Sequence, residues 1–67
     1  MSKESAFLIY CMELEKQARR LSGRQVYDLF ERYGLFEFVT RFYELLHVHG
    51  EKYILEDLDA RIAELAA

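Results

Sequence analysis

The chain has 67 residues, a net charge of −3 and a hydrophobic share of 52%, and Cys11 is its only cysteine. A single domain of this length lies near the lower limit for folding without disulfides or metals, so a dense apolar core has to stabilise it. The acidic balance argues against nucleic acid as a partner, and no apolar run reaches the roughly 18 residues of a membrane span.

The first predicted helix covers residues 3–21, with Ser2 as its N-cap. Its expected core stripe recurs at helical spacing and consists of Phe7, Cys11, Leu14, Ala18 and Leu21, flanked by Tyr10. Cys11 lies in the run IYCME without a neighbouring base, so we expect a buried structural thiol and not a nucleophile. A lone thiol suits a reducing compartment, and we expect a cytoplasmic protein.

Two further helices are predicted at residues 24–32 and 35–46. Ser22 and Gln25 match a capping box at the start of the second helix, and Gly34 is expected to close it in a left-handed conformation. In the third, apolar side chains fill about half of the circumference and polar ones the rest, which indicates an amphipathic helix.

A fourth helix begins between Glu51 and Glu56 and runs to the C-terminus; residues 53–55 could equally be extended. The pattern predicts an all-α fold, a compact bundle of about four short helices that forms a single domain over residues 1–67. The side chains expected to be nearly inaccessible to solvent are Leu14, Phe30, Val39, Phe42, Leu46, Leu58 and Ile62.

The two histidines in Leu46-His47-Val48-His49 raise the question of a metal site. Residues two apart on a helix point away from each other, and no further ligands follow at zinc spacing. We therefore interpret His47 as the end of a helix, where it can donate to free carbonyl groups, and His49 as a solvated loop residue. No catalytic, cofactor-binding or metal-binding residue is predicted, and we expect no enzymatic activity.

Several short motifs occur in a particular order along nearly the whole chain. They are Phe7 and Cys11, Ser22-Gly23, the run Val26 to Phe30, Tyr33-Gly34, Tyr43-Glu44, Leu46-His47, Gly50 and the run Glu56 to Asp59. This order resembles a family of short bacterial proteins catalogued as a domain of unknown function. The resemblance implies a standalone fold and no established activity or cofactor. His49 departs from the family pattern, which further weakens the two-histidine metal site.

A lone domain of this size buries only about 60% of its unfolded surface, so the high apolar content predicts a surface left for a protein partner. We expect a non-catalytic interaction module that self-associates or serves as the companion of another protein. Its predicted interface lies opposite the core stripe of the first helix and comprises Leu8, Ile9, Met12, Lys16 and Arg19. The simplest contact is a symmetric homodimer, unless a neighbouring helix of the same chain covers Leu8 and Met12.

Two alternatives belong to other functional classes. A helix-turn-helix DNA-binding regulator would present Arg24 and Gln25, but Asp28 and Glu31 on the same helix would face phosphate. A small-ligand binder would use the hydroxyls of the five tyrosines, and it requires a pocket with converging polar groups.

Overall fold

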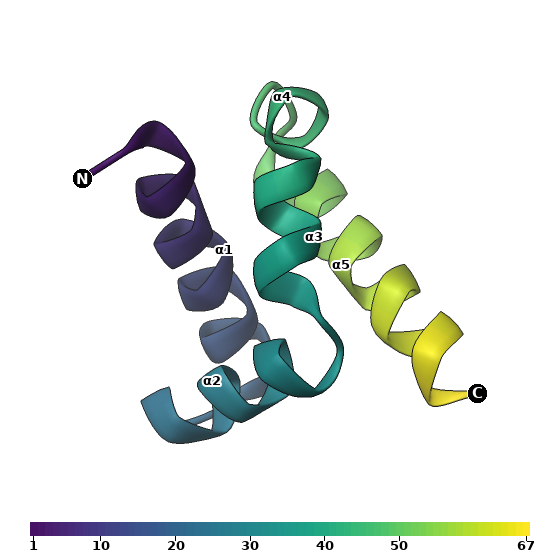
Figure 1. Ribbon diagram of the computed structural model, residues 1–67. Helices are drawn as coiled ribbons and strands as arrows, with labels where there is room; N and C mark the ends of the chain where they lie inside the picture. The colour runs from purple at the N-terminus through teal and green to yellow at the C-terminus, as the bar shows by residue number, and fades with distance from the viewer.

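The computed structural model describes all 67 residues and contains helices and no strand (Figure 1). The elements are α1 (Lys3–Arg19), α2 (Gly23–Arg32), α3 (Leu35–Arg41), α4 (Tyr43–Leu46) and α5 (Glu51–Ala66). Figure 1 shows α2 at the lower end of the molecule and the short α4 at the upper end. The predicted all-α class is confirmed, and residues 51–55 belong to α5.

The helix ends follow local sequence signals. Gln25 N–H donates to Ser22 Oγ at 3.1 Å, and Ser22 N–H donates to Gln25 Oε1 at 2.9 Å, so the predicted capping box is confirmed. Gly34 has φ 62° in the left-handed region that favours glycine, as predicted. Arg20, which ends α1, adopts φ 57° although it carries a Cβ.

The predicted third helix is interrupted at Phe42, where φ −103° and ψ 20° separate α3 from α4. Thr40 Oγ1 donates to the carbonyl oxygen of Phe36 at 2.8 Å. A threonine that bonds back to the carbonyl four residues earlier tends to bend a helix, which is a local reason for the change of direction. The bundle therefore has five helices where about four were expected.

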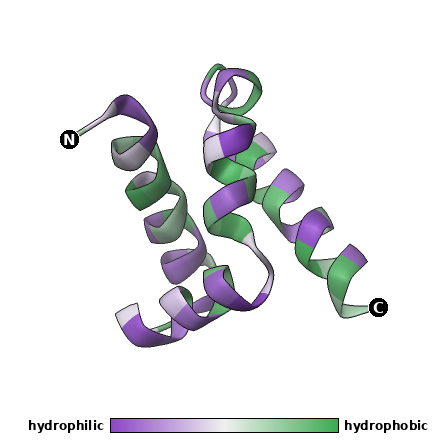
Figure 2. Cartoon of the chain, viewed as in Figure 1, coloured by the Kyte–Doolittle hydropathy of each residue, from purple (hydrophilic) through white to green (hydrophobic).

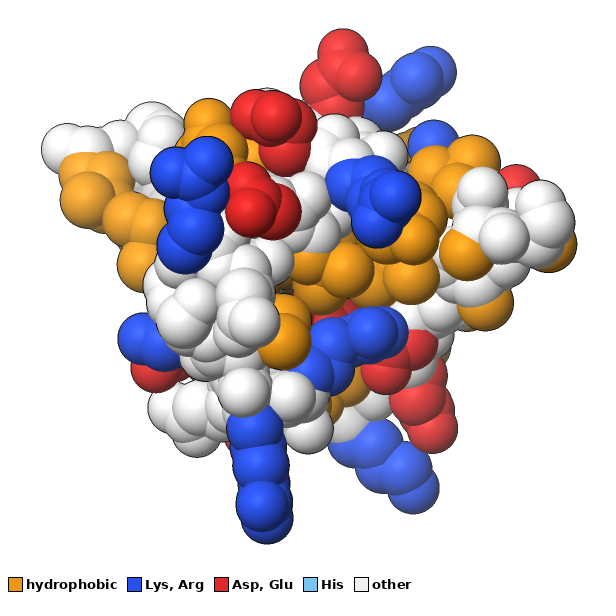
Figure 3. Space-filling view, turned by 90° about the horizontal axis from the view of Figure 1, so that it is seen from below, with side chains coloured by type: hydrophobic (Ala, Val, Ile, Leu, Met, Phe, Trp, Pro, Cys, Tyr) orange, Lys and Arg blue, Asp and Glu red, His pale blue; other side chains and the backbone are white.

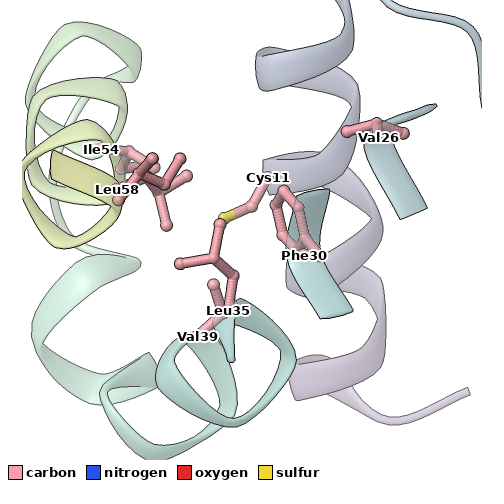
Figure 4. Close-up of a cluster of buried hydrophobic side chains, with 8 residues drawn as sticks. Cys11, Val26, Phe30, Leu35, Val39, Ile54 and Leu58 are labelled. Carbon is pink, nitrogen blue, oxygen red and sulfur yellow. The ribbon is translucent and has the colours of Figure 1, made fainter. Parts of the chain in front are cut away.

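The hydrophobic core is formed by side chains from α1, α2, α3 and α5 that point toward one another (Figure 4). Its eight buried members are Cys11, Val26, Phe30, Leu35, Val39, Ile54, Leu58 and Ile62. Among the expected core residues, the burial of Phe30, Val39, Leu46, Leu58 and Ile62 is confirmed.

Two of the expected core residues are not fully buried. Leu14 packs against the core but is only half-buried, and Phe42 remains 37% exposed. Phe42 lies at the break between α3 and α4, where the direction of the chain changes. A prediction that treats residues 35–46 as one straight helix cannot place this side chain correctly.

The buried face of α1 also differs from the expected stripe. It centres on Cys11 and Glu15, whereas Ala18 and Tyr10 are exposed. Seven consecutive apolar residues, 6–12, cover nearly two turns of the helix, so the pattern alone leaves the buried face undefined. The helices that pack on α1, namely α2, α3 and α5, select the face.

Figure 2 colours the chain by hydropathy and shows hydrophobic and hydrophilic residues interspersed along both α3 and α5. The backbones of α3 and α5 both approach α1, but they approach each other only weakly. The side of the bundle between α3 and α5 is therefore more open than the side next to α1.

Candidate functional site

The five residues of the predicted interface all lie on α1, and the structure gives them different surroundings. Leu8 and Met12 are half-buried and pack against the core, and Lys16 is half-buried as well. Ile9 is 53% exposed, and Arg19 forms ion pairs within the chain. These placements concern contacts within one chain, and the predicted contact between chains stays a prediction. Ile9 is the apolar member of the set that projects most into solvent.

Arg19 belongs to a polar link between α1 and α5. Arg19 Nε donates to Glu15 Oε1 at 3.0 Å, and Arg19 Nη2 donates to Asp59 Oδ1 at 3.1 Å. Glu15 is fully buried, and its Oε2 atom has no hydrogen-bond partner. Burial, together with the neighbouring carboxyl of Asp59, raises the pKa of Glu15 to about 7, against the opposing effect of the Arg19 guanidinium.

This link is placed to hold two helices together. Cys11 lies one turn before Glu15 on the same face of α1, and burial, followed by the charge of Glu15, raises the pKa of its thiol to about 12. A thiol with so high a pKa remains protonated at neutral pH and is a poor nucleophile. Cys11 and the Glu15 side chain are both closed off from solvent, and the ion pairs of Arg19 join the buried Glu15 of α1 to Asp59 of α5.

The histidines pair with different tyrosines. His47 Nδ1 lies 2.8 Å from the carbonyl oxygen of Tyr43, and its ring stacks on that of Tyr43 with centroids 4.5 Å apart. With its proton on Nδ1, His47 donates to this carbonyl, in agreement with the interpretation of the helix end. His49 stacks on Tyr53 with centroids 3.8 Å apart. The chain holds no group of three or more His, Cys, Asp or Glu side chains able to bind a metal ion.

The main hollow on the surface lies between α3 and α5. A depression of about 870 Å³ is adjoined by a smaller one of about 300 Å³, and Phe38 and Phe42 line both. We call the two together the α3–α5 groove. Besides these two phenylalanines, the groove is lined by Arg32, Phe36, Glu37, Arg41, Leu45, Tyr53, Asp57, Arg61 and Leu65, among others.

The walls of the groove follow from helical spacing. Tyr53, Asp57, Arg61 and Leu65 recur every four residues along α5, on the stripe next to the buried Ile54, Leu58 and Ile62. On the opposite wall, Phe38 and Phe42 are also four residues apart, and Leu45 follows. The chain therefore brings together two partly apolar helical stripes and leaves a space between them.

The groove exposes large apolar side chains. Leu45 is 66% exposed, Tyr53 and Leu65 are each 47% exposed, and Phe42 is 37% exposed. Figure 3, which views the molecule from below, shows hydrophobic side chains at the surface with Lys and Arg side chains on both sides of them. An apolar strip with a charged rim is typical of a protein-binding surface.

Three arginines of the groove are free of acidic partners. The ion pairs of the chain involve Arg19 and Arg24, so Arg32, Arg41 and Arg61 take part in none. The guanidinium carbon of Arg61 lies 5.4 Å from the centre of the Phe38 ring, and that of Arg41 lies 5.8 Å from the centre of the Phe42 ring. The Nε atom of Arg61 is buried and lacks a hydrogen-bond acceptor.

The sequence prediction did not identify this groove, although one signal for it was present. The apolar half of residues 35–46 is wider than the roughly 100° stripe that a helix needs to pack on one core. Leu35, Val39 and Leu46 use part of that arc, and Phe42 and Leu45 remain at the surface. The excess width predicts an uncovered face; which part of the arc stays uncovered depends on the position of α5.

Taken together, these features define a small all-helical domain with an open, arginine-rimmed apolar groove. None of its five helices combines the length and the apolar character needed to cross a membrane. A family model described as a protein of unknown function (DUF3791) matches residues 6–64, and the chain belongs to this family. The resemblance inferred from the short motifs is thereby confirmed at the level of the family. Searches among curated proteins and among solved structures find no match to the chain.

Proposed function

We propose that this protein is a small, non-catalytic protein-interaction module that binds its partner in the α3–α5 groove. The observation that carries the proposal is the exposure of Phe42, Leu45, Tyr53 and Leu65 along the two walls of one hollow. Burial of such side chains in a complex would contribute about 25 cal/mol for each Å² removed from water.

The alternatives have less support from the geometry. Arg24, which a helix-turn-helix regulator would direct to DNA, instead lies 3.3 Å from Asp28 Oδ1 on the same helix. The groups with shifted pKa values, Glu15, Cys11 and Arg19, do not line the α3–α5 groove, so this hollow lacks the shifted titratable groups expected of a catalytic centre. The free, buried thiol of Cys11 and the resemblance to short bacterial proteins favour a bacterial cytoplasm as the location.

Site-specific photo-cross-linking tests the proposal. A photoreactive amino acid at Leu45 in the full chain, expressed in its source cells, is expected to give discrete covalent adducts with protein. Glu31 on α2, which is exposed and outside the groove, is the matched control position and should give none. Equal labelling at both positions, or no adduct from Leu45, would contradict a role for the groove.

Self-association through α1 is a second form of the same function. Ile9 and Tyr10 are 53% and 43% exposed and belong to a different surface from the groove. Because Leu8 and Met12 contact the core, a change at Ile9 tests this form with less risk to the fold. If the wild-type chain is a dimer through this surface, Ile9→Glu is expected to halve its mass in sedimentation with its helicity retained. An unchanged dimer mass would exclude the α1 contact.

A further inference from the structure

We propose, on the basis of the function proposed above, that the α3–α5 groove recognises an acidic amphipathic helix of a different protein. Carboxylates of this helix would pair with Arg32, Arg41 and Arg61, and its apolar side chains would cover Phe42 and Leu65. The proposal combines three observations: the free arginines, the dimensions of the walls, and the distribution of charge over the chain.

The arginines specify the chemistry of the partner. Each guanidinium has a fork of N–H donors that matches a carboxylate, and these three have no acidic partner within 4 Å. Arg61 is partly buried, and its Nε atom is covered by the chain itself, so a carboxylate would reach this guanidinium through its Nη groups. An Nη–H bond to a carboxylate is charge-assisted and stronger than a bond between neutral groups.

The rings of Phe38 and Phe42 hold two of these arginines at the groove. Arg61 lies over Phe38 and Arg41 lies over Phe42, so both guanidinium groups are placed against aromatic surface before any partner arrives. A side chain that is already ordered loses less conformational entropy when it binds. The rings of Phe38 and Phe42 therefore support the charged contacts with the partner as well as the apolar ones.

The walls suit a helix. The α5 stripe from Tyr53 to Leu65 extends over about 18 Å at 1.5 Å per residue, which equals about three turns of a helix laid along it. Helices that bind in grooves present apolar anchors three or four residues apart, and their flanking positions face the rim. Acidic residues at those flanking positions would reach the arginines.

Charge argues for a different protein over a second copy in the same groove. A two-fold axis through the groove would place the arginine rim of one copy against that of the other, and like charges at an interface are unfavourable. The groove has a charge of +1, from three arginines against Glu37 and Asp57, although the chain as a whole has −3. Glu37 and Asp57 also line the groove and would disfavour the continuous phosphates of a nucleic acid.

The test is a display library of 16-residue amphipathic helices with leucine anchors, in which the flanking positions vary among Glu, Gln and Lys. Selection on the immobilised full-length chain at low salt is expected to enrich Glu at these positions. The affinity of the selected peptide should fall about fivefold with Arg41→Gln, fall with rising salt, and remain unchanged with Arg24→Gln outside the groove. Arg61→Lys retains the charge but removes the fork and should also weaken binding. Circular dichroism would verify that each variant is folded.

The outcomes separate this inference from the function on which it rests. Enrichment of Gln or Lys in peptides that still require Phe42 would overturn the acidic partner and leave the groove as an interaction surface. Absence of any enrichment would also overturn the acidic helix, and the cross-linking from Leu45 would then decide the proposed function independently. If a single-stranded 20-mer oligonucleotide displaces the selected peptide and binds more tightly, the acidic helix is overturned and the ligand of the groove is a nucleic acid.

Discussion

Replacement of Glu15 by glutamine should change how the stability of the protein depends on pH. The pKa of Glu15 rises from its ordinary 4.5 to about 7 in the folded chain, first because of burial and second because of Asp59. The folded state therefore holds this proton more tightly than the unfolded state does. The resulting stabilisation is complete below pH 4.5 and is lost as the pH rises to 7 and above.

The size of this effect is large for a domain of this length. A rise from 4.5 to about 7 corresponds to about 3 kcal/mol at 1.36 kcal/mol per pH unit. The total free energy of unfolding expected for such a chain is about 3–10 kcal/mol. At pH 5 glutamine resembles the protonated acid, so Glu15→Gln should have little effect. At pH 8 it avoids the buried charge and should stabilise the fold by up to about 3 kcal/mol.

Urea unfolding followed by circular dichroism at pH 5 and pH 8 measures the difference in the free energy of unfolding between Glu15→Gln and the wild type. Glu13→Gln is the control because Glu13 is exposed on the same helix and its Oε1 accepts only from Gln17, at 3.1 Å. That control should follow the wild type at both pH values. If Glu15→Gln and the wild type lose stability in parallel between pH 5 and 8, the reasoning about the buried carboxyl is wrong.

Three further predictions concern the core, a helix end and the thiol. Phe30→Ala should lower the free energy of unfolding by about 3–5 kcal/mol, and Phe42→Ala by clearly less because Phe42 is 37% exposed; equal losses in urea titrations would contradict the assignment of the groove. Gly34→Val should cost more than about 1 kcal/mol, since φ 62° strains a β-branched residue, and an unchanged melting temperature would disprove that strain. The thiol of Cys11, buried and with its pKa raised to about 12, should react with a disulfide reagent at pH 8 only as fast as the chain opens. Rapid reaction in native buffer, matching that of the chain in urea, would refute this burial.

Local signals allowed the start of α2 and the turn after it to be predicted from the sequence. The capping box at Ser22 and Gln25 and the left-handed Gly34 each depend on a few adjacent residues. The first helix was predicted to end at residue 21 and ends at Arg19, because Arg20 adopts a left-handed conformation. The burial of Glu15 could not be predicted from local signals. It depends on the packing of α1 in the bundle and on Asp59, which Arg19 connects to Glu15 from α5.

The orientation of α1 and the presence of the groove could not be predicted from the sequence, because both depend on the positions of neighbouring helices. Because Ala6 to Met12 are all apolar, several faces of α1 satisfied the pattern equally. Cys11 was correctly placed inside, but packing against α2, α3 and α5 also buried Glu15 and left Tyr10 and Ala18 exposed. Phe42 was assigned to the core because residues 35–46 were treated as one straight helix. Side-chain bonding by Thr40 and the break that follows are the details that the periodicity missed.

The backbone hydrogen bonds of this chain have a consequence for how it folds. Of 48 such bonds, 35 lie within helices, and none of the other 13 joins residues more than five apart. Among the side-chain hydrogen bonds, only that from Arg19 to Asp59 joins distant parts of the chain. Each helix can therefore complete its own bonding before any neighbour docks, a topology associated with folding in microseconds to milliseconds. The folded chain also presents no unpaired strand edge, which is the usual template on which a second chain grows into a sheet.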